Sequence, residues 1–223
     1  MREDHSDLRQ SLQHVYWLGG SPCAGKSSTA DFLVSRYGWR LYRCDDAYYE
    51  HCQAPDPERD SLLYRLSRLA HDALWLERSV EQQVREEYAL YLEEWNWIVR
   101  DLQALPRDRP ILVEGAALLP ELVEPLLNVR SRALWMIPTG EFQRYHYSQR
   151  TWAWDAVRGC SDPARAFENW MQRDICFART IEAEARRRGL KVLMVDGART
   201  LPESMAYVER LLCGEGEANA SAY

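Results

Sequence analysis

Eight residues near the start of the chain have the types and the spacing of a phosphate-binding loop. They read GSPCAGKS from Gly20 to Ser27 and satisfy the pattern G-x-x-x-x-G-K-[ST]. Glycines at both ends of the loop allow backbone conformations that turn successive N–H groups toward one anion. A helix that begins at the lysine adds the positive end of its dipole. These residues therefore predict the binding of a phosphate chain.

The side chains of this loop predict a nucleoside triphosphate with Mg²⁺. Lys26 is expected to reach the β- and γ-phosphates, and the Ser27 hydroxyl is expected to ligate the metal. Of 28 lysines and arginines only Lys26 and Lys191 are lysines, so a lysine at this position indicates a chemical requirement. A chance glycine-rich turn before a helix is the alternative. The predicted nucleotide-binding residues of the loop are Gly20, Ser21, Pro22, Cys23, Ala24, Gly25, Lys26, Ser27 and Ser28.

Three carboxylates follow short apolar segments that we expect to be strands. Asp45 and Asp46 come after residues 40–44, and Glu114 comes after 111–113. In an open α/β sheet, ligands bind outside the carboxyl ends of the strands, so these carboxylates should converge there. Adjacent residues at a strand end point to opposite sides, so we assign Asp46 to orient an acceptor hydroxyl and to accept its proton late in the reaction. A surface turn that favours Asp is the alternative.

The remaining pattern predicts a doubly wound α/β protein with a five-stranded parallel sheet in three layers. The expected strands cover 15–18, 40–44, 111–113, 133–137 and 191–195, and the expected framework helices cover 27–37, 142–148, 162–189 and 201–212. Residues 150–161 are predicted to form a loop. Asp162 before Pro163 is a typical helix start.

Residues 47–109 interrupt this alternation of strands and helices and predict an inserted helical hairpin. Apolar residues from Leu62 to Leu76 form the stripe of one long amphipathic helix, and a second stripe runs from Val80 to Leu102. A capping box formed by Ser79 and Gln82 separates the two helices. We expect the hairpin to shape a substrate pocket. The aromatic residues that either line this pocket or pack against a neighbouring element are Tyr48, Tyr49 and Trp97.

Together these motifs resemble the small-molecule and nucleotide kinases of the P-loop superfamily, whose phosphate loop is the Walker A motif. The segment CDDAYYE at 44–50 looks like the D-x-x-x-E element of shikimate kinases and chloramphenicol phosphotransferases, and ILVEG at 111–115 is similar to the third strand of uridine-kinase-like enzymes. The resemblance covers the sheet framework and not residues 51–109. It implies ATP and Mg²⁺ as cofactors and implies that Asp46 faces the acceptor hydroxyl.

The sequence departs from the family pattern at the metal site. A Walker B aspartate is expected at the end of the third strand, and Glu114 stands there instead. Metal ligation beyond Ser27 therefore stays open between Asp45 and Glu114.

The resemblance also implies roles for arginines. P-loop kinases carry a mobile lid after the fourth strand, which corresponds here to residues 144–163. The transferred phosphoryl group must be met by cations, and we assign this role to Arg150 and Arg158, with Arg173 as the next choice. Arg199, after the last strand, lies where related kinases carry a loop against adenine, so it could stack on the base. A solvated surface residue is the alternative for each arginine.

Composition and charge limit the other possibilities. The 223 residues are 46% hydrophobic and 28% charged, which predicts a single folded core. The resemblance implies one P-loop kinase domain over 1–213, and the small residues of 214–223 predict a disordered tail. A net charge of −6 argues against broad nucleic-acid binding. No run approaches the roughly 18 apolar residues of a membrane span, so we expect no membrane partner and a cytoplasmic location. Six scattered cysteines indicate neither a zinc site nor disulfides.

The function that the sequence predicts is an ATP-dependent phosphotransferase. It would move the γ-phosphate to a hydroxyl or phosphate group of a small molecule. A nucleoside or nucleotide kinase is the alternative among enzymes. A non-catalytic nucleotide-binding switch, whose helical insertion docks a protein, is the alternative of another class.

Overall fold

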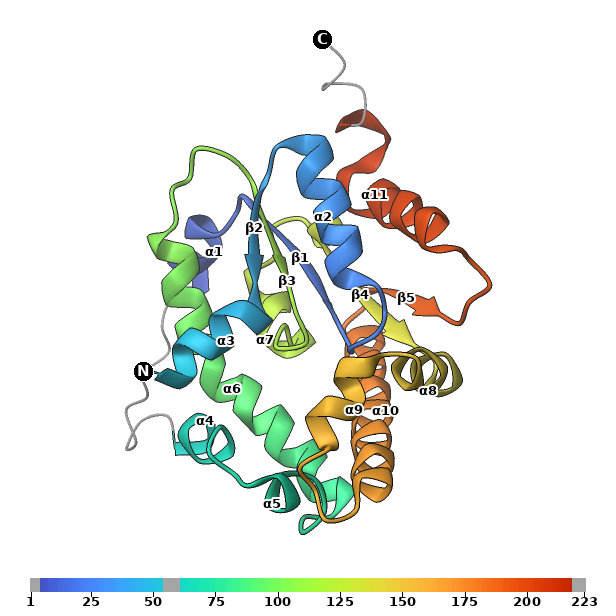
Figure 1. The fold of residues 1–223 in the computed structure, drawn as a ribbon. Helices are drawn as coiled ribbons and strands as arrows, with labels where there is room; N and C mark the ends of the chain where they lie inside the picture. The colour runs from blue at the N-terminus through green and yellow to red at the C-terminus, as the bar shows by residue number, and fades with distance from the viewer. Residues whose placement is uncertain (1–4, 54–60, 218–223) are drawn as a thin grey trace.

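The structure is a computed structural model that describes residues 5–53 and 61–217 (Figure 1). Helices and strands alternate along most of the chain, with a mainly helical stretch between the second and third strands. In chain order the elements are α1 (His5–Ser11), β1 (Val15–Gly20), α2 (Lys26–Tyr37), β2 (Arg40–Arg43), α3 (Cys44–Gln53), α4 (Ser61–Leu66), α5 (His71–Trp75), α6 (Val80–Ala104), β3 (Ile111–Glu114), α7 (Pro120–Val123), η1 (Glu124–Leu126), η2 (Arg130–Arg132), β4 (Ala133–Pro138), α8 (Gly140–Ser148), α9 (Thr151–Val157), α10 (Pro163–Arg187), β5 (Lys191–Val195) and α11 (Leu201–Glu217).

The five strands form one parallel sheet in the order β2-β3-β1-β4-β5. In the centre, Val15 pairs with Ile111 on one side and Trp17 pairs with Ala133 on the other. Every residue of β1, β3 and β4 is buried, because helices cover both faces of the sheet. The prediction of a doubly wound, five-stranded parallel α/β sheet is therefore confirmed.

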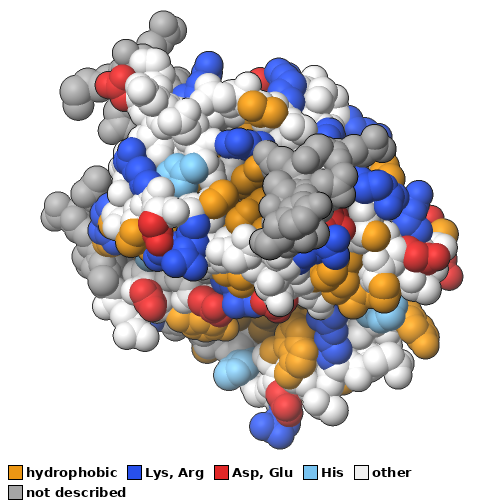
Figure 2. Space-filling model, turned by 90° about the horizontal axis from the view of Figure 1, so that it is seen from above, with side chains coloured by type: hydrophobic (Ala, Val, Ile, Leu, Met, Phe, Trp, Pro, Cys, Tyr) orange, Lys and Arg blue, Asp and Glu red, His pale blue; other side chains and the backbone are white. Residues whose placement is uncertain are grey.

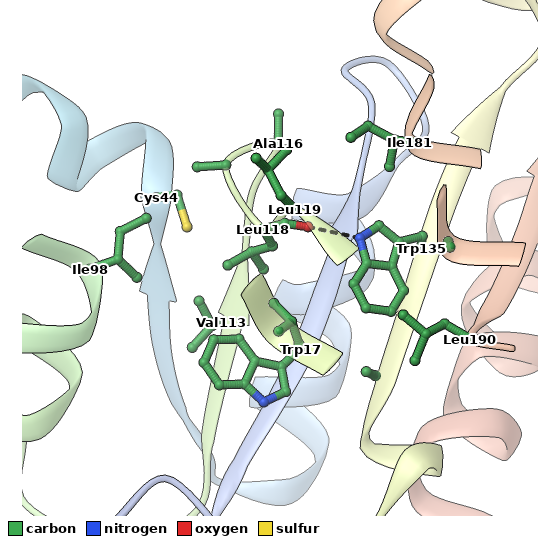
Figure 3. Packing of buried hydrophobic residues seen from close by; sticks show 14 of the residues in the cluster. Trp17, Cys44, Ile98, Val113, Ala116, Leu118, Leu119, Trp135, Ile181 and Leu190 are labelled. Atoms are coloured by element: carbon green, nitrogen blue, oxygen red, sulfur yellow. Dashed lines mark hydrogen bonds between the residues drawn. The ribbon is translucent and has the colours of Figure 1, made fainter. Parts of the chain in front are cut away.

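One face of the sheet packs against α6, α7 and α10. Trp17 of β1 and Trp135 of β4 are the largest side chains there, and both are almost fully buried (Figure 3). The indole nitrogen of Trp135 donates a hydrogen bond to the carbonyl oxygen of Leu118 at 2.8 Å. This bond satisfies the polar atom of a ring that is otherwise surrounded by apolar groups.

The other face packs against α2 and α11. Leu18 of β1 and Met136 of β4 contact a second apolar cluster that includes Leu33 of α2 and Val208 of α11. The two clusters hold β1 rigidly from both sides. The loop that follows β1 is thus anchored to the centre of the sheet.

A third apolar cluster joins α8, α9 and α10 to the helical insertion. Trp75 of α5 lies in this cluster with Val157 of α9 and Trp170 of α10, and the rings of Trp75 and Trp170 lie 5.1 Å apart. Asp72 of α5 also accepts a hydrogen bond from the backbone N–H of Ser161 at 2.7 Å. The segment predicted as a lid and the insertion therefore form one wall.

Two long helices begin where the sequence predicts. The Ser79 hydroxyl accepts a hydrogen bond from the backbone N–H of Gln82 at the start of α6. The Asp162 carboxylate does the same for Arg165 at the start of α10, where Pro163 is the first helical residue. Both caps form because backbone N–H groups in the first turn of a helix have no helical acceptor, and the side-chain oxygen supplies one.

Two predicted segments are wrong. The helix expected over Leu62 to Leu76 is instead two short helices, α4 and α5, separated by a turn at 67–70. There the Ser67 hydroxyl bonds the Tyr64 carbonyl at 3.0 Å, and such local bonds compete with continued helix. The loop expected over 150–161 contains α9, because Ala153 and Val157, four residues apart, are both buried on one helix face.

The end of the chain is described only in part. The closing helix α11 contains a non-helical residue, Gly214, with φ 71° and ψ 168°. Most of the tail predicted over 214–223 lies outside the described residues.

Two further observations concern the surface. On the face shown in Figure 2, basic, acidic and hydrophobic side chains are interspersed. The helices of the described residues lack the combination of length and apolar character that crossing a lipid bilayer requires.

Candidate functional site

A cavity of about 510 Å³ opens beside the start of α2, near the carboxyl ends of β1 and β3. Its walls come from six separate parts of the chain. The lining residues are Pro22, Cys23, Gly25, Lys26, Ser27 and Ser28 from the loop and α2; Asp45 from α3; Glu87 and Tyr91 from α6; Glu114 and Ala116 from the end of β3; Tyr147, Arg150 and Trp152 from α8 and α9; and Trp170, Arg173 and Asp174 from α10.

The loop between β1 and α2 has the backbone of an anion-binding turn. Gly20, Cys23 and Gly25 have positive φ angles of 121°, 69° and 85°. A Cβ at Gly20 would overlap the carbonyl oxygen of Met136 on β4, so only glycine fits there. Gly25 is the N-cap of α2, and the helix begins at Lys26. The N-terminus of α2 thus faces the cavity.

Lys26 is the cation of this loop and is almost fully buried. Its Nζ donates a hydrogen bond to the carbonyl oxygen of Ser21 at 2.7 Å. Burial lowers the pKa of Lys26, and the nearby charges of Glu114 and Asp45 oppose this by raising it. A buried ammonium group at the N-terminus of a helix is a site for an anionic group.

Glu114 faces Lys26 from the end of β3 and is also buried. Burial raises the pKa of Glu114, as does the charge of Asp45, whereas Lys26 and a hydrogen bond with Ser27 lower it. Two carboxylates and a hydroxyl therefore share one small region. Oxygen groups of this kind suit a hard divalent cation such as Mg²⁺. Among the residues that the structure describes, no group of three or more His, Cys, Asp or Glu side chains could hold a metal ion.

The two adjacent aspartates lie in the first turn of α3, not at the tip of a strand. Both aspartates are exposed, but Asp45 lines the cavity and Asp46 does not. Successive residues of a helix are rotated by about 100°, so only one of the two can face the cavity. The absence of a Cβ at Gly115 lets α3 begin close to β3, because a Cβ there would clash with Cys44.

The wall formed by α6 and α10 carries a buried charge cluster. Arg173 donates two hydrogen bonds to Oδ1 of Asp174, from Nε at 2.9 Å and from Nη2 at 2.6 Å. Its Nε also lies 3.3 Å from Oε2 of Glu87. Burial raises the pKa of Glu87 to about 7; Arg173 acts in the opposite direction and Asp174 adds to the increase. This part of the cavity holds two carboxylates against one guanidinium group.

Aromatic rings and one arginine complete the wall from α8, α9 and α10. The ring of Trp170 lies 5.2 Å from that of Tyr147 and 6.0 Å from that of Trp152. The guanidinium group of Arg150 lies 5.3 Å from the Tyr147 ring and 5.7 Å from the Trp152 ring. Arg150 is thus held beside aromatic faces on the cavity wall.

Of the predicted residues outside the loop, the structure brings some to the cavity and leaves others away from it. Asp45, Glu114 and Arg150 line the cavity, and so does Arg173. Arg158 does not: its side chain is 80% exposed and pairs with Asp155.

Arg199 is exposed and does not line the cavity. Its guanidinium group lies 5.0 Å from the ring of Tyr207 on α11.

The aromatic residues proposed for an acceptor pocket lie elsewhere. Trp97 packs beside His51 at 5.7 Å, and the Arg100 guanidinium lies 3.8 Å from its ring. Tyr48 and Tyr49 contact each other on α3, and neither lines the cavity. Of the two readings in the sequence, packing against a neighbouring element describes Trp97.

Sequence reasoning missed seven residues of the cavity wall: Glu87, Tyr91, Ala116, Tyr147, Trp152, Trp170 and Asp174. The signal for Glu87 lies in α6, where Gln83, Glu87 and Glu94 are all buried at helical spacing. A polar stripe beside an apolar one is the pattern of a helix that lines a site. The adjacent opposite charges of Arg173 and Asp174, inside a helix, gave no comparable signal.

Comparisons with known proteins give little beyond this geometry. No family model matches the sequence, and no curated protein matches it. Solved structures that match include a crystal structure described as "a putative kinase" from Chloroflexus aurantiacus J-10-fl. The two chains are 14% identical, the match covers 90% of this chain and 99% of the other, and the TM-score is 0.42. At that TM-score we draw no conclusion from the likeness.

Proposed function

We propose that the protein is an ATP-dependent kinase that transfers a phosphoryl group to a hydroxyl group of a small molecule. The observation that carries this proposal is the loop with Gly20, Cys23 and Gly25 in left-handed conformations, which leads into α2 at the wall of the cavity. Loops of this kind bind the phosphates of nucleotides through backbone N–H groups. The part of the cavity beside α6 and α10 would hold a second substrate.

The donor phosphates would lie on the loop. Backbone N–H groups of residues 20–27 and the N-terminus of α2 would bind the β-phosphate, and Lys26 would exchange its hydrogen bond to Ser21 for one to the β- and γ-phosphates. Arg150 lies between α8 and α9 and lines the cavity, where its guanidinium group would contact the γ-phosphate.

The residues present fit a magnesium ion. Ser27 and Glu114, which hydrogen-bond to each other, would hold it from the protein side. When bound, Mg²⁺ supplies positive charge that offsets the charge of the phosphates. Glu114 would then stand in the place of the aspartate expected in related kinases.

Asp45, rather than Asp46, would orient the acceptor hydroxyl. Its carboxylate lines the cavity between the loop and the wall formed by α6 and α10, where an acceptor would approach the γ-phosphate. In phosphoryl transfer such a carboxylate aligns the hydroxyl and takes its proton late, and general-base assistance of this type contributes about 10²- to 10⁴-fold. In this proposal the role predicted for Asp46 passes to its neighbour.

The two lysines of the chain provide a matched test of nucleotide binding. Lys26→Met should weaken Mg·ATP binding by at least roughly tenfold, because a charge-assisted contact to phosphate is lost. Lys191→Met should leave the affinity unchanged, because Lys191 lies on β5 and donates its hydrogen bond to the carbonyl oxygen of Leu211 in α11. Isothermal titration calorimetry with ATP and GTP measures both. Equal affinities for the two variants would contradict the proposal.

Substitutions of Asp45 and Asp46 test whether the protein transfers a phosphoryl group or only binds nucleotide. With an acceptor that releases ADP above the water background, Asp45→Asn should lower kcat by about 10²-fold or more, while Asp46→Asn should retain most of it. A coupled assay of ADP release gives both values. The reverse order would return the acceptor role to Asp46. Unaltered kcat in both variants would remove the acceptor role from both aspartates, whereas Mg·ATP binding with no ADP release above the water background for any acceptor would favour a nucleotide-binding switch.

A further inference from the structure

The part of the cavity wall formed by α6 and α10 carries Glu87, Arg173 and Asp174, and the carbonyl oxygen of Asp174 accepts a hydrogen bond from the Ser21 hydroxyl of the phosphate-binding loop at 3.4 Å. Glu87 is 7% exposed, and its Oε1 accepts a hydrogen bond from the Tyr91 hydroxyl at 3.2 Å. Its Oε2 is buried and lies 3.3 Å from Nε of Arg173, but no hydrogen-bond donor stands in suitable geometry to it. A buried carboxylate oxygen without a donor is costly, so this oxygen is a site for a donor supplied from the cavity.

The arginine of the same wall is already engaged. Both hydrogen bonds described for Arg173 go to Asp174, and its guanidinium group lies 5.0 Å from the Trp75 ring. Asp174 is fully buried, and its Oδ2 accepts a further hydrogen bond from Gln143 at 3.2 Å. An anionic group that approached Arg173 would therefore meet Asp174 and Glu87 as well. Two negative charges against one positive charge repel an anion there.

The neighbouring rings favour a flat partner. Tyr147, Trp152 and Trp170 contact one another on the wall beside Glu87 and Arg173. Aromatic faces bind rings by packing and attract cations through their negative faces. Arg150 is a further cation of the cavity wall, and in the proposed function it binds the phosphoryl group that is transferred.

We propose that Glu87 determines acceptor specificity by binding an N–H or O–H donor, best a cationic amine, of a cyclic hydroxyl compound that carries no anionic group. This inference rests on the proposed kinase function and narrows it: nucleoside monophosphates and carboxylated sugars are excluded as acceptors. Burial raises the pKa of Glu87 to about 7 and the charge of Asp174 adds to the increase, although Arg173 opposes it, so a cationic donor from the cavity would stabilise the ionised carboxylate further.

The test compares hydroxyl compounds that share a scaffold and differ in charge. The sets are serotonin, N-acetylserotonin and 5-hydroxyindole-3-acetate; glucosamine, glucose and glucuronate; and cytidine with cytidine monophosphate. Calorimetry first establishes Mg·ATP binding, and its failure would overturn the proposed function rather than this inference. Each compound is then added at millimolar concentration to the nucleotide-loaded protein, and ADP release and the shift in melting temperature are recorded.

The anion-free members should give the larger responses. For the best of them, Glu87→Gln should raise KM roughly 10- to 100-fold, as expected for the loss of a hydrogen bond to a charged group, with kcat changed less than about threefold. Glu77→Gln, which alters an exposed carboxylate just before α6, is the matched control and should leave KM unchanged. For a cationic compound, KM should fall as the pH rises through about 7 in the wild type and stay flat in Glu87→Gln.

Three results would overturn the inference. The first is a larger response to the anionic members of the sets. The second is an unchanged KM in Glu87→Gln. The third is the absence of any response to the anion-free compounds by a protein that binds Mg·ATP normally. A general loss of stability in Glu87→Gln would lower kcat and the melting temperature without altering the pH dependence of KM, and this separates a structural role from a specificity role.

Discussion

At the scale of single residues, Cys23 occupies a backbone conformation that side chains rarely adopt. Its φ of 69° lies in the left-handed region, in the middle of the phosphate-binding loop. This conformation costs a residue with a Cβ roughly 1–2 kcal/mol. The loop keeps it because the left-handed turn points the next N–H groups into the cavity.

Replacing Cys23 should reveal that strain. Cys23→Val has a side chain of similar size but branches at Cβ, so it should lower the free energy of unfolding by roughly 1–2 kcal/mol and weaken Mg·ATP binding. Cys23→Gly should keep the wild-type affinity, because glycine adopts the conformation freely. Urea denaturation and calorimetry measure the two effects. A valine variant with wild-type stability and affinity would show that the loop is not strained at this position.

The loop was predictable from sequence because its chemistry is local. Spacing alone places Gly20, Gly25 and Lys26 around one anion. The choice between Asp45 and Asp46 was not predictable in the same way, since it depends on α3 beginning at Cys44 directly after β2. Glu87 is farther still from the loop in sequence. Its place in the cavity follows only from the packing of α6 against α10.

At the scale of elements, α3 is fastened to α6 by a buried polar network. His51 of α3 lies 3.2 Å from Oε1 of Glu94 through Nδ1 and 2.9 Å from Oδ2 of Asp101 through Nε2. The Tyr42 hydroxyl of β2 donates to the same oxygen of Asp101 at 3.0 Å. Because α3 carries Asp45 in its first turn, this network sets the position of a cavity carboxylate.

His51→Ala should destabilise the protein in a pH-dependent way. Burial lowers the pKa of His51, but hydrogen bonds to Glu94 and Asp101 outweigh it and the net pKa is raised. A raised histidine pKa contributes stability that is present below about 6.5 and is lost as the pH rises through the folded-state value. The loss in His51→Ala should therefore be largest near pH 6, about 3 kcal/mol, because two carboxylates lose their partner.

Urea denaturation from about pH 5.5 to about pH 8, which is roughly one unit below to roughly one and a half units above the ordinary histidine pKa, measures this dependence. His71→Ala, at an exposed position on α5, serves as the control and should show only a small loss. A His51→Ala loss that is constant across the range would contradict a charged His51.

The elements themselves were predictable where end signals and periodicity agree. Ser79 and Asp162 are caps that precede long amphipathic stripes, so α6 and α10 could be located. The break between α4 and α5 has no glycine or proline to mark it. The helix α9 was missed because the exposed Trp152 and Trp154 obscure the buried pair Ala153 and Val157. A local hydrogen bond of Ser67 accompanies the first case, whereas burial decided the second, and burial depends on partners far away in the chain.

At the scale of the whole molecule, the cavity is assembled from parts that fold together. The loop after β1 is held by the sheet, the wall with the charge cluster by α6 and α10, and the aromatic side by α8 and α9. Topology predicts that the loop and the strand ends share one edge of the sheet. It does not predict how the insertion closes the cavity, because that depends on the third apolar cluster around Trp75 and Trp170.

A ligand that contacts several of these parts should stabilise the whole fold. At a Mg·ATP concentration of 100 times Kd, linkage adds about 2.7 kcal/mol, which corresponds to a rise in Tm of roughly 5–11 °C for a chain of this size. Lys26→Met should abolish most of the rise, and Lys191→Met should keep it even if its basal Tm is lower. Differential scanning calorimetry with and without Mg·ATP measures the shift for each protein. A rise of equal size in Lys26→Met would mean that the nucleotide binds outside the loop, because stabilisation by binding follows the affinity at the site that is occupied.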